Sequence, residues 1–144
     1  MHHSRLSTIV IDCDVADLAP SARFWSQALG KPIVTVDQDG DGKYAELKTE
    51  ADESIILLQK VEHSSRVHLD LETDDLEAEA ARLEALGAKR IAFVRDRWWV
   101  MEAPTGHRFC VVHKQRDQFG PHTSTHGIDH SLKTAHGEPV EPSW

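Results

Sequence analysis

Cysteine is scarce in this chain, which holds only Cys13 and Cys110 among its 144 residues. A disulfide framework is therefore excluded as the basis of the fold, and both thiols are interpreted as small buried side chains in a reducing compartment. No apolar run approaches the roughly 20 residues that a membrane helix needs, and residues 1–7 contain no apolar stretch of the signal-peptide type. We therefore expect a cytoplasmic protein without membrane contact.

Positive charge is also limited. Sixteen Lys and Arg residues stand against 24 Asp and Glu residues, which gives a formal net charge of −8. Nonspecific nucleic-acid binding needs clustered cations that neutralise phosphates, so this balance argues against a nucleic-acid partner. The overall charge favours a cationic or neutral ligand. The length suffices for one domain with a hydrophobic core.

Periodicity in the first half predicts a strand, a helix and three further strands. The β-branched run at 8–13 is typical of a buried strand. A helix begins near Asp17 or Pro20 and ends at Leu29, since Asp17 suits an N-cap and Gly30 a helix end. Strands follow at 32–36, 43–48 and 54–61, with a turn over residues 37–42 that contains two glycines.

The second half repeats this order. A strand is predicted at 66–72, a helix from Asp74 or Asp75 to Leu86, and strands at 91–94, 98–102 and 108–113. Residues 28–30 and 85–87 both read Ala-Leu-Gly, and Asp-Leu recurs at 17–18 and 75–76. Such agreement indicates an internal repeat, with modules at about 6–61 and 66–114. Residues 115–144 are rich in His, Pro and Gly and predict a flexible tail or an arm over a partner subunit.

Three features resemble the vicinal-oxygen-chelate superfamily, in its glyoxalase-like branch. They are Phe-Trp at 24–25 before the first Ala-Leu-Gly, the Ala-Pro-Thr-Gly turn at 103–106, and His-Leu-Asp-Leu at 68–71. The resemblance covers about residues 6–114. It implies an α+β fold in which two tandem βαβββ modules form a curved mixed sheet around a cavity. It leaves the activity open, because that superfamily includes lyases, dioxygenases, isomerases, epimerases and drug-binding proteins.

Strand parity then selects the residues that face the cavity, because alternate residues of a strand share a face. His68, Asp70 and Glu72 are predicted to point inward, whereas Val67, Leu69 and Leu71 are predicted to pack under a helix. On the other strands, the same parity directs inward Asp12, Leu57, Gln59, Arg108, Cys110 and Val112.

The resemblance also implies where a metal would bind, namely at positions on four strands that here hold Val10, Leu57, His68 and Cys110. Only His68 is an ordinary ligand, and neither Val10 nor Leu57 offers a lone pair. A metal site usually needs three or four converging donors. We therefore expect no metal and no other cofactor, although a ligand set that the motifs do not reveal would restore metal-dependent dioxygenase or lyase chemistry.

His68 with Asp70 and Asp12 forms the candidate catalytic group. A carboxylate beside an imidazole raises its pKa and fixes its tautomer, which suits a general acid or base. The alternative is a structural histidine that is hydrogen-bonded to Asp12 across the two modules. Candidate ligand contacts are Trp98, Trp99, Gln59, Cys110 and Arg108. Because adjacent strand residues face opposite ways, one of the two tryptophans should line the cavity and the other should pack outward.

Three hypotheses follow for function. The first is a metal-independent protein that binds or sequesters a small molecule, as drug-resistance proteins do. The second is a lyase or isomerase that uses His68 with Asp70 or Asp12, and the third is a regulatory module without chemistry. The resemblance implies a homodimer. His122, His126 and His130 stand four residues apart and could hold zinc or nickel on a helix, but Pro121 and Gly127 favour a flexible tail.

Overall fold

The computed structural model describes residues 1–36, 42–116, 119–120 and 122–127. Residues 37–41 of the predicted turn, and His130, lie outside the described residues. The described chain contains two helices and nine strands. In chain order they are β1 (His2–Cys13), α1 (Leu18–Leu29), β2 (Ile33–Val36), β3 (Tyr44–Leu47), β4 (Ile55–Lys60), β5 (Arg66–Thr73), α2 (Leu76–Ala85), β6 (Lys89–Val94), β7 (Trp98–Glu102), β8 (Arg108–His113) and β9 (Ser124–His126).

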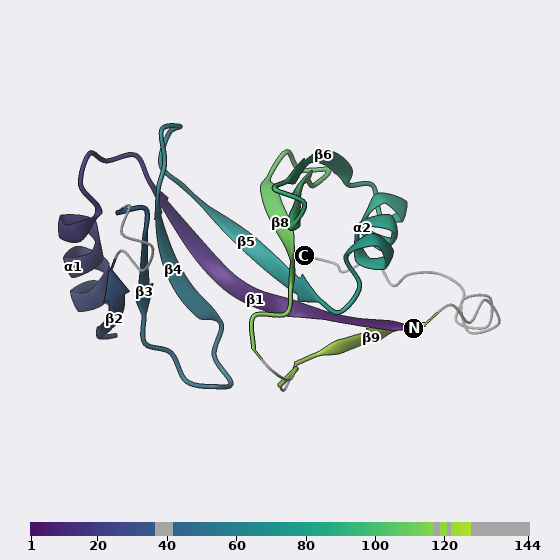
Figure 1. The fold of residues 1–144 in the computed structure, drawn as a ribbon, viewed down its shortest axis with the longest axis horizontal. Coiled ribbons are helices and arrows are strands. Elements are labelled where there is room, and N and C mark those ends of the chain that lie inside the picture. Colours follow the sequence, from purple (N-terminus) through teal and green to yellow (C-terminus); the bar gives the residue numbers. More distant parts are fainter. Residues whose placement is uncertain (37–41, 117–118, 121, 128–144) are drawn as a thin grey trace.

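The strands form one mixed sheet in the order β2-β3-β4-β1-β5-β8-β7-β6. Its two βαβββ modules meet edge to edge where β1 pairs antiparallel with β5. Within each module the first strand runs parallel to the last, β1 beside β4 and β5 beside β8. The sheet curves between the modules (Figure 1). This arrangement confirms the predicted α+β class with tandem modules.

Both helices begin and end at the residues that the sequence marks. The Asp17 carboxylate accepts a hydrogen bond from the backbone N–H of Ala19 at 3.1 Å and caps α1, and Asp75 caps α2 in the same way through Ala78. Gly30 ends α1 in the left-handed conformation, with φ of 68°. Such a conformation is easily adopted only by glycine, which explains its place after the last helical turn.

Each module has its own core between its helix and its part of the sheet. In the first module α1 packs Leu18 and Ala22 against Leu47 and Leu58. In the second, Ala80 and Leu83 of α2 pack against Met101 of β7 and Val111 of β8. The helices thus lie at opposite ends of the sheet, on either side of β1 and β5 (Figure 1).

This placement corrects two predictions for β5. Val67 and Leu69 do not pack under a helix and are 56% and 43% exposed, since they lie on the central part of the sheet between the two helices. Of that set, only Leu71 packs against the second core. Glu72 does not line the cavity either. Its carboxylate accepts a hydrogen bond from Arg5 Nε at 2.7 Å, and both side chains are buried.

The segment predicted as a tail contributes a strand. Ser124–His126 forms β9, which pairs antiparallel with the first residues of β1, so β1 begins at His2 rather than near residue 8. The described part of this segment therefore lies along the chain's own N-terminal strand. None of the helices in the described ranges is long and apolar enough to cross a bilayer.

Candidate functional site

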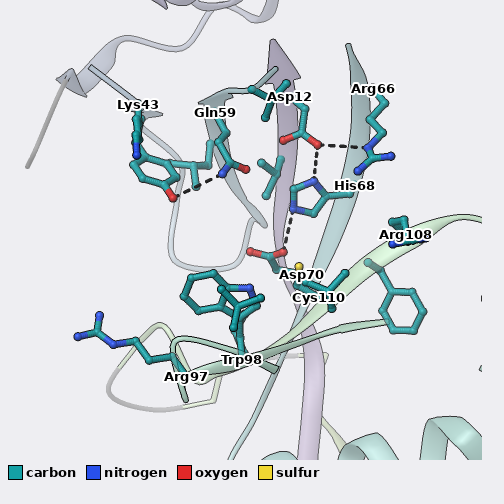
Figure 2. A pocket seen from close by; sticks show the side chains of 18 of the residues that line it. Asp12, Lys43, Gln59, Arg66, His68, Asp70, Arg97, Trp98, Arg108 and Cys110 are labelled. Carbon is teal, nitrogen blue, oxygen red and sulfur yellow. Dashed lines mark hydrogen bonds and ion pairs between the residues drawn. The ribbon is translucent and has the colours of Figure 1, made fainter. Parts of the chain in front are cut away.

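A cavity of about 1170 Å³ opens on the face of the sheet where the two modules meet. Strands from both modules line it, so the edge-to-edge joining of β1 and β5 creates it. Figure 2 shows its central side chains. Residues that line it include Val10, Asp12, Tyr44, Leu57, Gln59, Arg66, His68, Asp70, Trp98, Arg108 and Cys110.

His68 lies between two carboxylates on the cavity wall. Its Nδ1 is 2.7 Å from Asp12 Oδ2, and its Nε2 is 3.3 Å from Asp70 Oδ1 (Figure 2). The register explains the meeting, because β1 pairs Val10 with His68 and so brings Asp12 alongside the ring. Asp12 is almost fully buried, whereas the side chains of His68 and Asp70 retain 14% and 17% exposure. Parity thus placed all three predicted catalytic residues in one cavity.

The two carboxylates favour the charged form of this imidazole. Burial by itself lowers the pKa of His68, but the hydrogen bonds to Asp12 and Asp70 and the nearby Cys110 thiol outweigh it and raise the pKa to about 11. At neutral pH the ring is therefore an imidazolium that carries a proton on each nitrogen and donates from Nδ1 to Asp12. In that state His68 can act as an acid or as a hydrogen-bond donor, but not as a base.

Two carboxylate oxygens in this group lack a well-formed hydrogen bond. They are Asp12 Oδ1 and Asp70 Oδ1, both of which are buried at the atomic level. Although Asp70 Oδ1 faces His68 Nε2 at 3.3 Å, this contact is an ion pair without hydrogen-bond geometry. An unsatisfied buried acceptor is costly, so each oxygen is suited to accept a proton or a donor from a bound molecule.

The predicted ligand contacts divide between the two faces of the sheet. Trp98, Gln59, Cys110 and Arg108 line the cavity. Trp99 does not line the cavity, so the prediction that it contacts the ligand is wrong. Its ring lies 4.8 Å from that of Phe93 and beneath the guanidinium of Arg90, also at 4.8 Å, within the second core.

Of the cations around the cavity, the sequence interpretation identified Arg108 but not Lys43, Lys60 or Arg66. The lining carries six Lys and Arg residues against three Asp and Glu residues, although the whole chain carries an excess of acid. Arg66 shares the parity of His68, which would have identified it, and it lies 3.8 Å from Asp12. The cationic set is Lys43, Lys60, Arg66, Arg95, Arg97 and Arg108.

Two of these cations come from a strained turn between β6 and β7. Arg95 and Asp96 have φ of 51° and 53°, and the backbone N–H of Arg97 donates to Val94 O at 2.9 Å. Two successive residues with positive φ form the hairpin turn that normally requires Asn and Gly. A long side chain such as Arg95 is unfavourable there, yet this turn brings Arg95, Arg97 and Trp98 to the cavity mouth.

Of the four strand positions where the family resemblance implies metal ligands, only those of His68 and Cys110 hold side chains that can donate to a metal. Val10 and Leu57 supply no donor, which excludes the oxygen-rich shell that a hard cation requires. One ring nitrogen of His68, an Asp70 oxygen and Cys110 Sγ, however, lie within 4.8 Å of one another. Asp70 was not predicted as a ligand. A nitrogen, oxygen and sulfur set suits zinc, and the Asp12 contact to Nδ1 would orient the ring for it.

Comparisons with known proteins agree with this fold. The family model of the glyoxalase-like domain matches residues 8–112. No curated protein sequence matches the chain. Among solved structures, a hypothetical protein from Bacillus halodurans has a TM-score of 0.59 at 14% identity, covering 81% of this chain and 99% of its own.

Two further solved structures share the fold. Methylmalonyl-CoA epimerase from Mycobacterium tuberculosis has a TM-score of 0.54 at 18% identity, covering 78% of this chain and 89% of its own. A glyoxalase/bleomycin resistance protein/dioxygenase superfamily member from Vibrio splendidus has a TM-score of 0.51 at 16% identity, covering 77% and 99%. At these identities the likeness concerns the fold alone.

Proposed function

This chain belongs to the glyoxalase-like domain family of the vicinal-oxygen-chelate superfamily, and from that premise we propose that it binds a small anionic molecule in its cavity without a resident metal. The observation that carries the proposal is the contrast between an acidic chain and a cavity whose lining holds six Lys and Arg residues against three Asp and Glu residues. Two free thiols, Cys13 and Cys110, are consistent with action in the cytoplasm.

The charge of the lining selects the ligand class. Arg97 and Arg95 are exposed at the mouth, and Arg66 stands on the wall beside His68. Arginine side chains bind carboxylates and phosphates through paired N–H donors. The local field therefore favours an anion, which replaces the expectation of a cationic or neutral ligand that the net charge alone suggested.

Trp98 selects a planar group on the ligand. Its indole is half-buried on the cavity wall, which Asp70 and Arg97 also line (Figure 2). Aromatic faces stack on flat, apolar or conjugated groups and contribute about 0.5–1.5 kcal/mol beyond burial. An aromatic or conjugated carboxylate of drug or metabolite size fits both the volume and the lining.

His68 supplies the most buried positive charge in this lining. Asp12 holds Nδ1 at hydrogen-bond distance, whereas the contact of Nε2 with Asp70 is longer and poorly aligned. A ligand carboxylate can therefore compete for the Nε2 proton. If the protein is a lyase or isomerase, the same geometry assigns the acid to His68 and the base to Asp70, whose Oδ1 has no hydrogen-bond donor.

A second candidate function is a zinc-dependent reaction in the same cavity. It is favoured by the donors of His68, Asp70 and Cys110, which lie within 4.8 Å of one another. Bound zinc would supply a Lewis acid that polarises an oxygen of the substrate. His68 would have to release the Nε2 proton to bind it, so proton and metal compete for one nitrogen.

The test compares three probes of one ring system: an aromatic carboxylate, its methyl ester and the matching aromatic amine. We expect calorimetry to detect binding of the carboxylate and to show much weaker binding of the methyl ester and the amine. Replacing Arg97 by Gln should weaken binding of the carboxylate about fivefold, which corresponds to the roughly 1 kcal/mol that an exposed charge contributes. Arg23→Gln, on the exposed side of α1 and outside the cavity lining, is the matched control.

Preferential binding of the amine, or equal effects of Arg97→Gln and Arg23→Gln, would contradict the proposal. Metal analysis of the protein as purified distinguishes the zinc-dependent alternative from the metal-free proposal. One zinc per chain that disappears in His68→Gln would favour it over the metal-free proposal. For the enzymatic alternative, turnover that survives His68→Gln would exclude a role for this imidazole.

A further inference from the structure

A second group of metal-binding side chains lies outside the cavity, where β1, β9 and α2 meet. It consists of His2 on β1, Glu79 on α2 and His126 on β9. His2 and Glu79 are buried, with 7% and 0% exposure, and His126 is partly buried. Figure 1 shows β9 beside the N-terminal part of β1, close to α2.

Register and packing bring these residues together from distant parts of the sequence. The β1–β9 pairing places His2 directly opposite His126. Their rings are 5.1 Å apart, centre to centre. Glu79 points at both rings, with its Oε1 2.9 Å from His2 Nε2 and 4.0 Å from His126 Nε2.

The donor distances are close to those of a zinc shell. One donor atom from each residue lies within 4.8 Å of the others. Zinc holds imidazole nitrogens and carboxylate oxygens at about 2.0–2.2 Å in a tetrahedron, so its ligands stand roughly 3.3 Å apart. Small side-chain rotations would bring the three donors to one point, and water can complete the fourth position.

The donor atoms of this group already have hydrogen-bond partners. Glu79 Oε1 lies 2.9 Å from His2 Nε2, and His126 Nε2 lies 2.8 Å from Ser4 Oγ. A metal would replace these contacts, so metal and protons compete for the same nitrogens.

Arg82 is the competing cation at this site, and its geometry allows it to remain. Its Nη2 donates to Glu79 Oε2 at 2.8 Å, and its Nε donates to Oε1 at 2.7 Å. A metal on Oε1 would displace the Arg82 Nε contact and leave Oε2 bonded to Nη2 of the guanidinium. Carboxylate ligands are commonly held by such an outer hydrogen bond, which fixes their orientation.

We propose that His2, Glu79 and His126 form a zinc-type metal site that fastens the segment after β8 to the N-terminal strand and α2. The site is structural, because its ligands are largely buried and separate from the cavity lining. The His122–His126–His130 spacing had suggested metal binding on a helix. Here His126 is instead on a strand, and its partners are His2 and Glu79.

The experiment titrates the full-length, untagged, chelator-treated chain with zinc, using a chromophoric chelator as competitor. It is performed in a His68→Gln background, which removes the candidate cavity site. We expect one zinc per chain. His126→Ala and Glu79→Gln should each weaken zinc binding by at least about 100-fold, since losing an outer partner alone typically costs 10- to 100-fold. His122→Ala, four residues earlier on the same segment and outside the group, is the matched control.

Thermal unfolding separates loss of the site from loss of the fold. Zinc should raise Tm in the His68→Gln and His122→Ala proteins but not in His126→Ala, because only a ligand of the native state stabilises it. The inference is overturned by zinc affinity that is unchanged in a folded His126→Ala protein. It is equally overturned by a zinc Kd weaker than about 1 mM in the His68→Gln protein, which would make the binding adventitious.

Discussion

The charge on His68 depends on Asp12 and Asp70, one on each side of its ring. The two acids come from different modules, so the charged imidazole exists only when β1 and β5 are joined. A charge held in this way links stability to pH, because the unfolded chain does not keep the carboxylates in place.

The sign of that dependence follows from the raised pKa. Stability from the imidazolium is fully present below the unfolded pKa near 6.5 and is lost as pH rises through the folded value of about 11. Between pH 7 and 10 the wild-type free energy of unfolding should fall, relative to that of His68→Gln, by up to about 1.4 kcal/mol per pH unit. Urea unfolding of both proteins at several pH values measures the difference. If the free energy of unfolding depended on pH in the same way in both proteins, the ring would be neutral in the folded state.

Arg5 and Glu72 form a buried ion pair whose loss should be costly. Arg5 Nε lies 2.7 Å from Glu72 Oε1, and the other Glu72 oxygen accepts the backbone N–H of Gln115 at 2.8 Å. Gly120 passes so near that an added Cβ would lie 2.9 Å from Arg5 Nη1. The pair therefore supports the segment after β8.

Removing one charge from this pair leaves the other buried and unpaired. Glu72→Gln should lower the free energy of unfolding by about 3–5 kcal/mol in urea denaturation. The pair of Lys31 and Glu53, whose side chains are 25% and 41% exposed, provides the control, since solvent screens it more strongly. Glu53→Gln should leave stability unchanged within error. An equal loss of stability in both variants would show that burial of the Arg5–Glu72 pair does not determine its contribution.

At the scale of the element, the β6–β7 turn brings Arg95 and Arg97 to the cavity in a backbone conformation that lowers stability. Arg95 and Asp96 both adopt positive φ, which glycine adopts without cost. Asp96 is not among the residues that line the cavity, so its conformation can be relieved without removing a ligand contact.

Asp96→Gly should therefore raise the free energy of unfolding by roughly 0.5–1 kcal/mol while leaving the affinity for the aromatic carboxylate unchanged. Asp96→Ala should lower stability, because alanine tolerates this conformation less well than Asp. Thermal unfolding and calorimetry together make the test. Stabilisation by Ala as well as Gly would mean that backbone strain is not the cause.

The elements differ in how well the sequence predicted them, for physical reasons. Residue alternation on β5 identified His68 and Asp70 as neighbours on one face. The N-caps of the two helices, Asp17 and Asp75, were each one of two candidates that the sequence offered, beside Pro20 and Asp74. The strand β9 was missed because it has only three residues and pairs with residues 2–4, far away in sequence. Periodicity describes one element at a time and holds no information on such pairing.

Some site features could not follow from periodicity at all. Parity placed one tryptophan of the 98–99 pair in the cavity, but only the sheet order shows that it is Trp98. Val67 and Leu69 alternate as core residues do, yet they are exposed because neither helix reaches the middle of the sheet. The cationic lining depends on which loops meet over the cavity, and net charge does not report this.

At the scale of the whole molecule, we propose that the chain forms a homodimer, as its family resemblance implies. Sedimentation velocity over a range of protein concentrations measures this directly. We expect a species of twice the chain mass that dissociates on dilution or persists throughout. The mass of a single chain at every concentration would contradict the proposal.

The cavity combines contributions from both modules into one electrostatic arrangement, in which an imidazolium lies between two acids and several cations line the surrounding wall. We propose that this arrangement works without a resident metal. The most direct test is the ¹⁵N NMR spectrum of the His68 ring in the full-length protein as purified, assigned with His68→Gln, between pH 7 and 9. We predict that both ring nitrogens carry protons throughout and that a chelator changes neither signal. A deprotonated Nε2, or one that responds to the chelator, would contradict the account.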